Sequence, residues 1–207
     1  MGSEMCIRDR ACGCGPLLGA PEELIQLVKN KQIKRVIDSY GLYRSASKGA
    51  QDIFEQAVRD GEIELRVYPM GTLAERYRAA AAGIPAFYTP TGVGSVVEDE
   101  LVSNIEGKRK KKETRIFMGE RYILEYALPP HFAFVHAYKG DREGNLRYRL
   151  TARNFNPVMA AAARVTIAEV ENLVEPGEIG PDDIHTPGIY VQKVVKVPRV
   201  TFATTID

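Results

Sequence analysis

Segments with the period of a β-strand are interleaved with segments of helical character along most of the chain. Ile63, Leu65 and Val67 alternate with Glu64, Arg66 and Tyr68, a pattern typical of a strand with one buried face. The next stretch, 73–82, has helical character, and Gly83 supplies a helix stop. Because helices alternate with strands instead of gathering in separate blocks, we expect an α/β fold with a layered sheet flanked by helices.

The start of the helix predicted at 73–82 carries a capping pattern. Thr72 is predicted to be its N-cap, and Glu75 stands at the third helical position, as in a capping box. A turn from a strand into a helix gathers backbone N–H groups at the helix N-terminus, where an anionic oxygen is stabilised. Glycine at position 71 permits a close approach. Met70, Gly71 and Thr72 therefore form a candidate oxyanion-binding turn.

The remaining elements follow from the same kinds of pattern. Helices are predicted from Pro21 onward, over 47–59 and over 157–163, and strands over 36–40, 63–68, 132–138, 146–150, 165–174 and 189–195. Residues 140–145 separate two of these strands and are predicted to form a hairpin turn. Residues 83–95 contain too much Gly and Pro for regular structure and are predicted to be a loop.

Composition excludes several classes of protein. The chain has 207 residues, 44% of them hydrophobic, and a formal net charge of +1, which indicates no nucleic-acid partner. Its apolar runs are too short to span a bilayer, and it opens with no signal-peptide pattern, so we expect a soluble cytoplasmic protein without a membrane partner. The basic run at 108–112 is flanked by glutamates, which favours a solvated excursion over a phosphate site.

Cysteine and histidine positions do not predict a metal site. Cys6, Cys12 and Cys14 lie close together near the start of the chain, and His131, His136 and His185 show no spacing that would complete a ligand set. Residues 1–10 carry no strand or helix pattern, and their sequence resembles translated sequencing-adapter text. We therefore interpret residues 1–10 as a non-native leader and expect a single domain over 11–207.

Two segments carry the most specific pattern. The first, at 70–94, is MGTLAERYRAAAAGIPAFYTPTGVG. The second begins with TARNFNP at 151–157 and continues with VTIAEVE at 165–171 and IHTPGIYV at 184–191. In this order, the blocks resemble those of the A (alpha) subunit of class I CoA-transferases of the 3-oxoacid type. The likeness extends from about residue 31 to about residue 197.

The resemblance implies a NagB/RpiA/CoA-transferase-like fold and a transferase that acts as a heteromer. Members of the family move CoA from an acyl-CoA such as succinyl-CoA to an acid such as acetoacetate, with CoA thioesters as substrates and no permanently bound cofactor. The nucleophilic glutamate belongs to the B subunit, in a Ser-Glu-Asn-Gly type motif that this chain lacks. We therefore expect a half-enzyme that is active only with a B subunit, in a heterodimer or heterotetramer. The end of the chain, close to the end of the likeness, favours separate subunits.

The resemblance also assigns candidate site residues. Substrate- or CoA-binding candidates are Gly83, Tyr88, Thr89, Thr91, Gly92, Asn154 and Asn156. For the residues at 88–92 the alternative is a rigid loop packed on the sheet, and for the two asparagines it is satisfaction of backbone groups. His185 is predicted to be structural.

Two departures from the family pattern bear on activity. Met70 stands where the family usually has a glutamine whose amide holds the thioester oxyanion, and the alternative for Met70 is a core filler. The family usually begins with a strand and a Gly-Gly-Phe-Gly loop, where this chain has GCGPLLGA at 13–20. These departures leave an alternative function open, a catalytically degenerate or non-enzymatic binding module of the same fold. No acid/base constellation supports a sugar-phosphate isomerase.

Overall fold

The structure is a computed structural model that describes residues 9–11, 22–39, 53–98 and 111–198. The three cysteines, the segment 13–20, the start of the helix predicted at 47–59 and residues 108–110 of the basic run lie outside the described residues. The described residues fall into two compact units. The first holds residues up to Leu73 together with Phe87–Glu125, and the second holds Ala74–Ala86 with the residues from Tyr126 onward.

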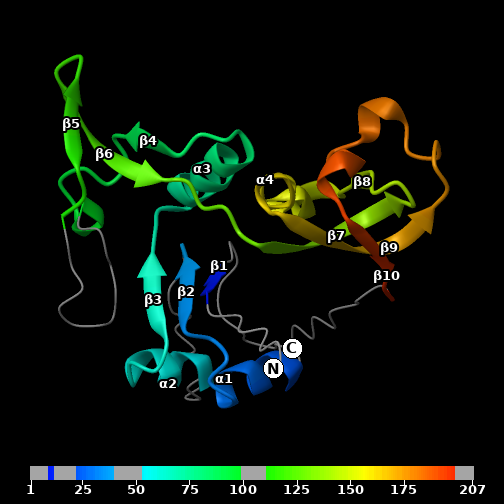
Figure 1. The fold of residues 1–207 in the computed structure, drawn as a ribbon, viewed down its shortest axis with the longest axis horizontal. Coiled ribbons are helices and arrows are strands. Elements are labelled where there is room, and N and C mark those ends of the chain that lie inside the picture. The colour runs from blue at the N-terminus through cyan, green and yellow to red at the C-terminus, as the bar shows by residue number, and fades with distance from the viewer. Residues whose placement is uncertain (1–8, 12–21, 40–52, 99–110, 199–207) are drawn as a thin grey trace, which may run out of the picture. The chain divides into compact units, whose positions relative to one another are not determined.

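A parallel sheet in the order β1-β2-β3 forms part of the first unit (Figure 1). Its elements in chain order are β1 (Asp9–Ala11), α1 (Glu22–Lys29), β2 (Arg35–Asp38), α2 (Ile53–Arg59) and β3 (Glu64–Val67). The helices and strands predicted here are confirmed with shifted ends. Asp9 and Arg10, which the sequence pattern placed in a leader, lie in β1, so the boundary expected after residue 10 does not coincide with the start of regular structure.

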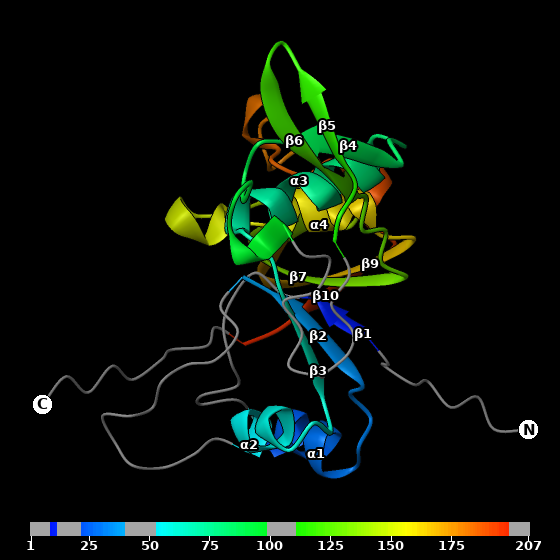
Figure 2. The ribbon, with the colours of Figure 1, turned by 90° about the vertical axis from the view of Figure 1, so that its left-hand side faces the viewer.

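The core of this unit forms where the two helices meet the strands. Figures 1 and 2 both show α1 and α2 side by side at the same end of β2 and β3. The buried side chains come from the helices, the strands and the turns that precede the strands: Val28, Ile33, Val36, Phe54, Ala57, Val58, Ile63 and Leu65. Burial of this apolar surface stabilises the unit.

Glu64 in β3 corrects the prediction of a strand with one exposed face. Its side chain is only 3% exposed and is paired with Arg35 at 2.7 Å and Arg66 at 3.0 Å. Burial opposes its ionisation, but the hydrogen bonds from the two guanidinium groups outweigh this and hold the pKa of Glu64 below its ordinary value. Strand β3 therefore begins covered on both faces, as is usual in parallel sheets.

The first unit also carries a second sheet, in the order β4-β6-β5. Its strands are β4 (Ala86–Thr89), β5 (Thr114–Phe117) and β6 (Glu120–Tyr126). The prediction of a loop over 83–95 is wrong for β4, and the antiparallel hairpin of β5 and β6 was not predicted. The hairpin closes at Met118 and Gly119, whose φ angles are 51° and 84°, the left-handed conformation that a tight hairpin turn requires.

Helix α3 (Met70–Ala81) begins earlier than the sequence predicts. Leu73 donates its N–H to the carbonyl of Pro69 at 2.9 Å, so the helix starts directly after a proline whose ring already fixes φ near the helical value. Thr72 therefore lies inside the first turn, and its Oγ1 has no hydrogen-bond partner in the described structure. The predicted capping box is wrong, because Glu75 instead binds Arg78.

Gly83 ends α3 as predicted. It has a φ of 70°, and the N–H groups of Gly83 and Ile84 donate to the carbonyls of Ala80 and Ala79. These two hydrogen bonds form a Schellman motif, which needs a residue in the left-handed region just after the helix. Gly83 therefore has a structural role that accounts for its presence.

The second unit is built on a mixed sheet in the order β10-β9-β7-β8. Its elements are β7 (Phe132–Asp141), β8 (Leu146–Arg147), α4 (Asn156–Ala162), β9 (Val165–Val174) and β10 (Lys193–Lys196). Strand β9 has the predicted bounds, and the predicted hairpin joins β7 to β8. The strand expected over 189–195 is displaced, because Gly188–Tyr190 form a 3-10 turn. Likewise, the strand expected over 146–150 ends at Arg147, and another 3-10 turn starts at Leu150.

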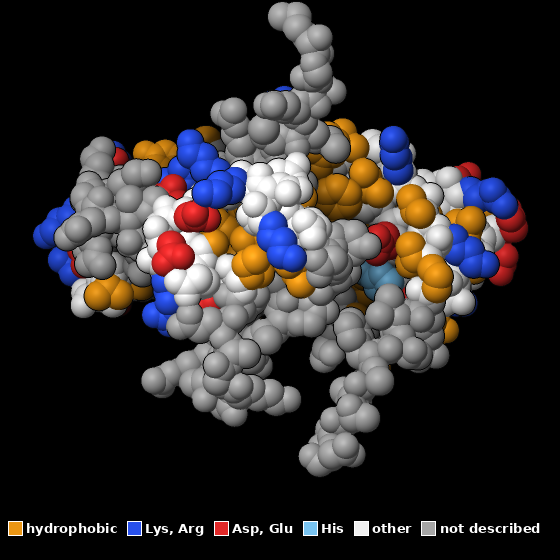
Figure 3. All heavy atoms as spheres, turned by 90° about the horizontal axis from the view of Figure 1, so that it is seen from below, with side chains coloured by type: hydrophobic (Ala, Val, Ile, Leu, Met, Phe, Trp, Pro, Cys, Tyr) orange, Lys and Arg blue, Asp and Glu red, His pale blue; other side chains and the backbone are white. Residues whose placement is uncertain are grey.

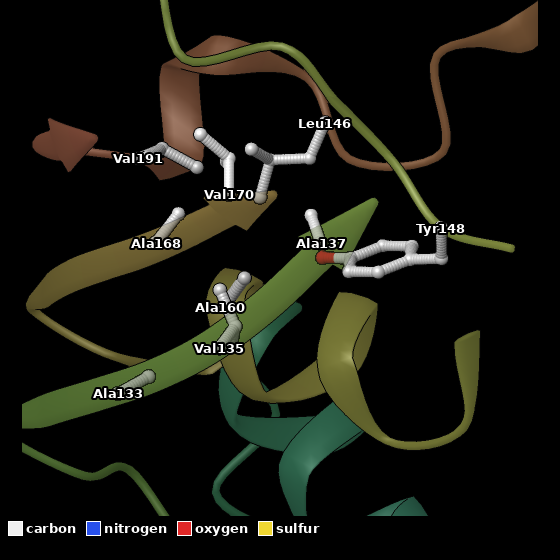
Figure 4. Close-up of a cluster of buried hydrophobic side chains, with 9 residues drawn as sticks. All are labelled: Ala133, Val135, Ala137, Leu146, Tyr148, Ala160, Ala168, Val170 and Val191. Atoms are coloured by element: carbon white, nitrogen blue, oxygen red, sulfur yellow. The ribbon is translucent and has the colours of Figure 1, made fainter. Parts of the chain in front are cut away.

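One side of this sheet forms the core of the second unit (Figure 4). Alternate residues of β7 and β9 point to the same side, where Ala160 of α4 lies opposite them. The cluster consists of Ala133, Val135, Ala137, Leu146, Tyr148, Ala160, Ala168, Val170 and Val191. The small side chains allow the helix to pack closely on the strands. The α/β fold predicted from the sequence is confirmed.

The surface shows a mixed character. The face drawn in Figure 3 carries basic, acidic and hydrophobic side chains intermingled among the described residues. Within the part of the chain that the structure describes, no helix combines the length and apolar character needed to cross a bilayer.

Candidate functional site

The first turn of α3 has the geometry expected of a site for an anionic oxygen. Met70 is 41% exposed, and Gly71 is exposed and open, since a Cβ built there meets no atom within 4 Å. The first N–H groups of a helix have no intrahelical partner, and no acidic side chain in this turn offsets the helix dipole. Thr72 is 4% exposed, and its Oγ1 is buried without a hydrogen-bond partner in the described structure. This turn can therefore stabilise negative charge with its backbone amides.

Met70 does not fill the core. Its exposure excludes that interpretation and leaves the side chain at the open end of the helix. A thioether donates no hydrogen bond, so the turn lacks the donor that an amide side chain would supply at this position.

The candidates at 88–92 occupy β4 and the loop that follows it, in the same unit as the α3 turn. Tyr88 donates its hydroxyl to Glu113 Oε1 at 2.6 Å, and its ring lies edge-on to Phe117 at 5.1 Å. Thr89 Oγ1 accepts the N–H of Thr91 at 3.2 Å. These contacts hold Tyr88 and Thr89 in place, while Thr91 is exposed.

The loop after β4 is fixed by a set of short contacts. Gly92 has a φ of 90°, and a Cβ there would lie 3.0 Å from that of Val97. Ser95 Oγ donates to the carbonyl of Gly92 at 2.7 Å, and Gly94 donates its N–H to Glu98 Oε2 at 2.9 Å. These contacts restrain the loop, and a restrained loop is compatible with substrate binding because preorganised groups bind at lower entropic cost.

The other candidates lie in the second unit. Asn156 is engaged at both ends of its amide: Oδ1 accepts the N–H of His136 at 3.3 Å and Nδ2 donates to the carbonyl of Ala152 at 2.8 Å. These bonds are the backbone role considered as the alternative. Asn154 is exposed, with a φ of 31°. Substrate contacts of Gly83, Asn154 and Asn156 stay a prediction.

His185 is held as a structural group. Its Nδ1 accepts the backbone N–H of Tyr148 at 3.0 Å, and its ring stacks on the Tyr148 ring at 11° and 6.1 Å. Burial, followed by the nearby Arg153 and Arg147, lowers the pKa of His185, against a smaller opposing effect of Asp183. An imidazole that accepts through Nδ1 has to be unprotonated there, in agreement with the lowered pKa. Burial also raises the pKa of Tyr148 to about 12.

A buried ion pair beside the site was missed by sequence reasoning. Lys112 Nζ lies 2.5 Å from Glu125 Oε1, with side-chain exposures of 5% and 6%. The prediction of a solvated basic excursion is therefore wrong at Lys112, whereas Lys111 beside it is exposed. Glu125 was the available signal, because a lone carboxylate in an otherwise apolar stretch of a strand needs a partner when it is buried.

The described residues contain no group of three or more His, Cys, Asp or Glu side chains arranged to hold a metal ion. The α3 turn offers backbone amides, and the β4 loop offers hydroxyl groups, whereas the charges of Lys112 and Glu125 are buried and paired with each other.

Comparison with known proteins identifies the family. Residues 19–197 match the model of the Coenzyme A transferase family, so the chain belongs to that family. Within it, the chain resembles the A subunits, as the sequence blocks indicated. One relative is a protein of Mycobacterium bovis named as the probable A subunit of a succinyl-CoA:3-ketoacid coenzyme A transferase. The two are 48% identical over 180 residues, which cover 84% of this chain and 70% of that protein.

Other relatives carry the same kind of name. The chain is 48% identical to the A subunit of the succinyl-CoA:3-ketoacid coenzyme A transferase of Helicobacter pylori, covering 82% of this chain and 66% of the relative. It is 50% identical to the probable A subunit of the Bacillus subtilis enzyme, covering 82% of this chain and 63% of the relative. The chain thus spans roughly two thirds of the length of these relatives.

Solved structures share the fold. Glutaconate coenzyme A-transferase from Acidaminococcus fermentans matches with a TM-score of 0.70 and 21% identity, covering 86% of this chain and 59% of that one. An acyl-CoA transferase from Escherichia coli O157:H7, in a thioester complex with CoA, matches with a TM-score of 0.70 and 22% identity over 94% of this chain and 46% of that one. At these identities the likeness establishes the fold.

Proposed function

We propose that the chain is the A half of a heteromeric 3-oxoacid CoA-transferase. It would move CoA from an acyl-CoA such as succinyl-CoA to a 3-oxoacid or short-chain acid such as acetoacetate. The observation that carries the proposal is the identity of 48–50% to relatives named as A subunits of succinyl-CoA:3-ketoacid coenzyme A transferases. The open first turn of α3 supports it with a group that such a reaction needs.

The reaction places a specific demand on this chain. A glutamate carboxylate supplied by the partner attacks the thioester carbonyl and displaces CoA thiolate, which gives a mixed anhydride of glutamate and succinate. The thiolate then attacks the glutamyl carbonyl of this anhydride, so that succinate leaves and a glutamyl-CoA thioester remains. Acetoacetate then attacks the glutamyl-CoA thioester and displaces the thiolate, and the thiolate attacks the acetoacetyl carbonyl of the new anhydride, which gives acetoacetyl-CoA and regenerates the glutamate carboxylate. Each attack drives negative charge onto a carbonyl oxygen, which the N–H groups of Gly71 and Thr72 would stabilise.

The remaining assignments follow from that role. The partner is a B subunit that supplies the glutamate, in a heterodimer or heterotetramer. The substrates are CoA thioesters and carboxylic acids, and no resident cofactor is required. A cytoplasmic location suits a reaction between these metabolites. Tyr88, Thr89, Thr91 and Gly92 would line the site on the side of the β4 loop.

The test is reconstitution. We expect the complex of this chain with its B subunit to convert succinyl-CoA and acetoacetate into acetoacetyl-CoA and succinate, and this chain alone to show no turnover. The assay follows acetoacetyl-CoA by its absorbance. A complex that forms but transfers no CoA to any short-chain acid would favour the degenerate module.

A further inference from the structure

Lys112 occupies an unusual position for a lysine. Its side chain is 5% exposed although it belongs to a run of basic residues and lies next to the exposed Lys111. Removing a lysine ammonium from water is unfavourable unless the charge is paired, and here Glu125 of β6 supplies the countercharge at 2.5 Å.

Lys112 also contacts two other segments of the first unit. Its ammonium lies 5.0 Å from the centre of the Tyr68 ring, a cation–π distance, and Tyr68 immediately follows β3. Its backbone N–H donates to the carbonyl of Glu98 at 3.0 Å. A single residue thus joins the end of β3, the strand β6 and the end of the loop that follows β4.

These contacts lead to both parts of the candidate site, which are the α3 turn and the β4 loop. Tyr68 is separated from Met70, the first residue of α3, only by Pro69. On the other side, the Glu98 carboxylate accepts the N–H of Gly94 at 2.9 Å and lies 3.2 Å from Arg121, which holds the loop containing Thr91 and Gly92. Side-chain and backbone contacts of Lys112 therefore connect the α3 turn to the β4 loop within one unit.

Stability alone does not explain such a pair. A buried ion pair loses much solvation free energy, and well-packed apolar residues of similar volume often give an equally stable fold. The charges fix geometry instead, because the ammonium has to satisfy Glu125 and the Tyr68 ring at the same time.

We propose that Lys112 is a positioning residue for the transfer reaction: paired with Glu125, it sets the α3 turn at Met70–Thr72 against the β4 loop at Tyr88–Gly92. The proposal rests on the proposed function for its kinetic readout. A small displacement between two groups that act on one substrate can lower a rate by about 100-fold.

The test compares three variants in the complex with the B subunit. Lys112→Met leaves the Glu125 carboxylate buried and unpaired, so we expect a lower Tm and a lower kcat. The double variant Lys112→Met/Glu125→Met removes both charges, so we expect a Tm close to that of the wild type. Its kcat should remain at least about tenfold below wild type, with KM changed less than about threefold. Lys111→Met makes the same charge change at an exposed position and should match the wild type.

Recovery of kcat together with Tm in the double variant would show that the pair only stabilises the fold and would overturn the proposal. If the wild-type complex itself transfers no CoA, the proposed function fails, and hydrogen exchange on the chain still tests the positioning. The double variant should then exchange the hydrogen-bonded amides of Leu73, in the first turn of α3, and of Gly94 at least about tenfold faster than wild type and Lys111→Met. Unchanged exchange in both segments overturns the proposal.

Discussion

At the scale of single residues, Met70 is the candidate site residue that we expect to depart from the family pattern. The side chain is exposed at the start of α3, so a substitution there can be accommodated without repacking a core. The turn otherwise has an open Gly71 and no acidic side chain to compete with an anionic oxygen.

We therefore predict that Met70→Gln increases kcat in the complex with the B subunit. The added amide can donate a hydrogen bond to the oxyanion, and removal of one such donor from other enzymes costs about 2.7–4 kcal/mol. A gain of at least about tenfold is expected, measured as acetoacetyl-CoA formation. Met70→Leu, which adds no donor, serves as the control, and equal rates for the two variants would show that position 70 does not face the oxyanion.

His185 makes stability depend on pH. Its pKa is lowered in the folded chain, so the folded state binds fewer protons than the unfolded state as the pH falls below about 6.5. The stabilisation of the folded state by neutral His185 is therefore complete above about pH 6.5 and is lost progressively below it. Measured by urea unfolding, the free energy of unfolding should fall less between pH 8 and pH 5 for His185→Gln than for wild type. An identical drop in the two proteins would exclude His185 as a source of the dependence.

At the scale of elements, the hairpin between β7 and β8 shows how one polar network fixes two segments. Asp141 is 2% exposed, and its carboxylate accepts N–H groups of Glu143 and Asn145 and the amide of Asn145. Asn145 Oδ1 in turn accepts the N–H of Gly188 at 2.9 Å. The hairpin turn is thereby tied to the segment that precedes β10.

Glycine is required at position 188 because the backbone of Glu143 passes close to it. A Cβ built on Gly188 would lie 2.2 Å from the carbonyl oxygen of Glu143, a backbone atom that cannot move alone. Gly188→Ala should destabilise the chain by about 1–3 kcal/mol, seen as a lower Tm in calorimetry. Gly180→Ala is the matched control, because the nearest atom to its Cβ is 3.8 Å away, and its Tm should stay near wild type. Equal Tm values for the two variants would contradict the packing described here.

The elements that sequence patterns predicted are those with a buried face. Strand β9 alternates buried and more exposed residues through most of its length, so its bounds could be predicted from periodicity. Strand β5 is exposed at all four residues and left no such pattern, although its hairpin partner β6 is partly buried. Glycine and proline around β4 indicated a loop, and pairing with β6 overrides that local preference.

Likewise, only part of the candidate site could be predicted from the sequence. The turn at Met70–Thr72 could be predicted because a strand followed by a helix gathers N–H groups at one place. Lys112 could not, because its burial depends on Glu125, Tyr68 and Glu98, which come from separate segments. A run of basic residues predicts solvent exposure when only the neighbouring sequence is considered.

At the scale of the whole molecule, membership of the Coenzyme A transferase family and the absence of a Ser-Glu-Asn-Gly type motif in this sequence define the central claim. We propose that this chain supplies the oxyanion turn and that a partner supplies the nucleophile. In this proposal, no described side chain near the α3 turn has to act as a covalent catalyst.

The location of the covalent intermediate tests this claim most directly. The complex of this chain with the B subunit is incubated with succinyl-CoA in the absence of an acceptor acid, and the intact mass of each polypeptide is measured. We predict the added mass of a CoA thioester on the B subunit, none on this chain, and loss of the adduct when acetoacetate is added. A CoA adduct on this chain, or turnover by this chain without its partner, would contradict the claim.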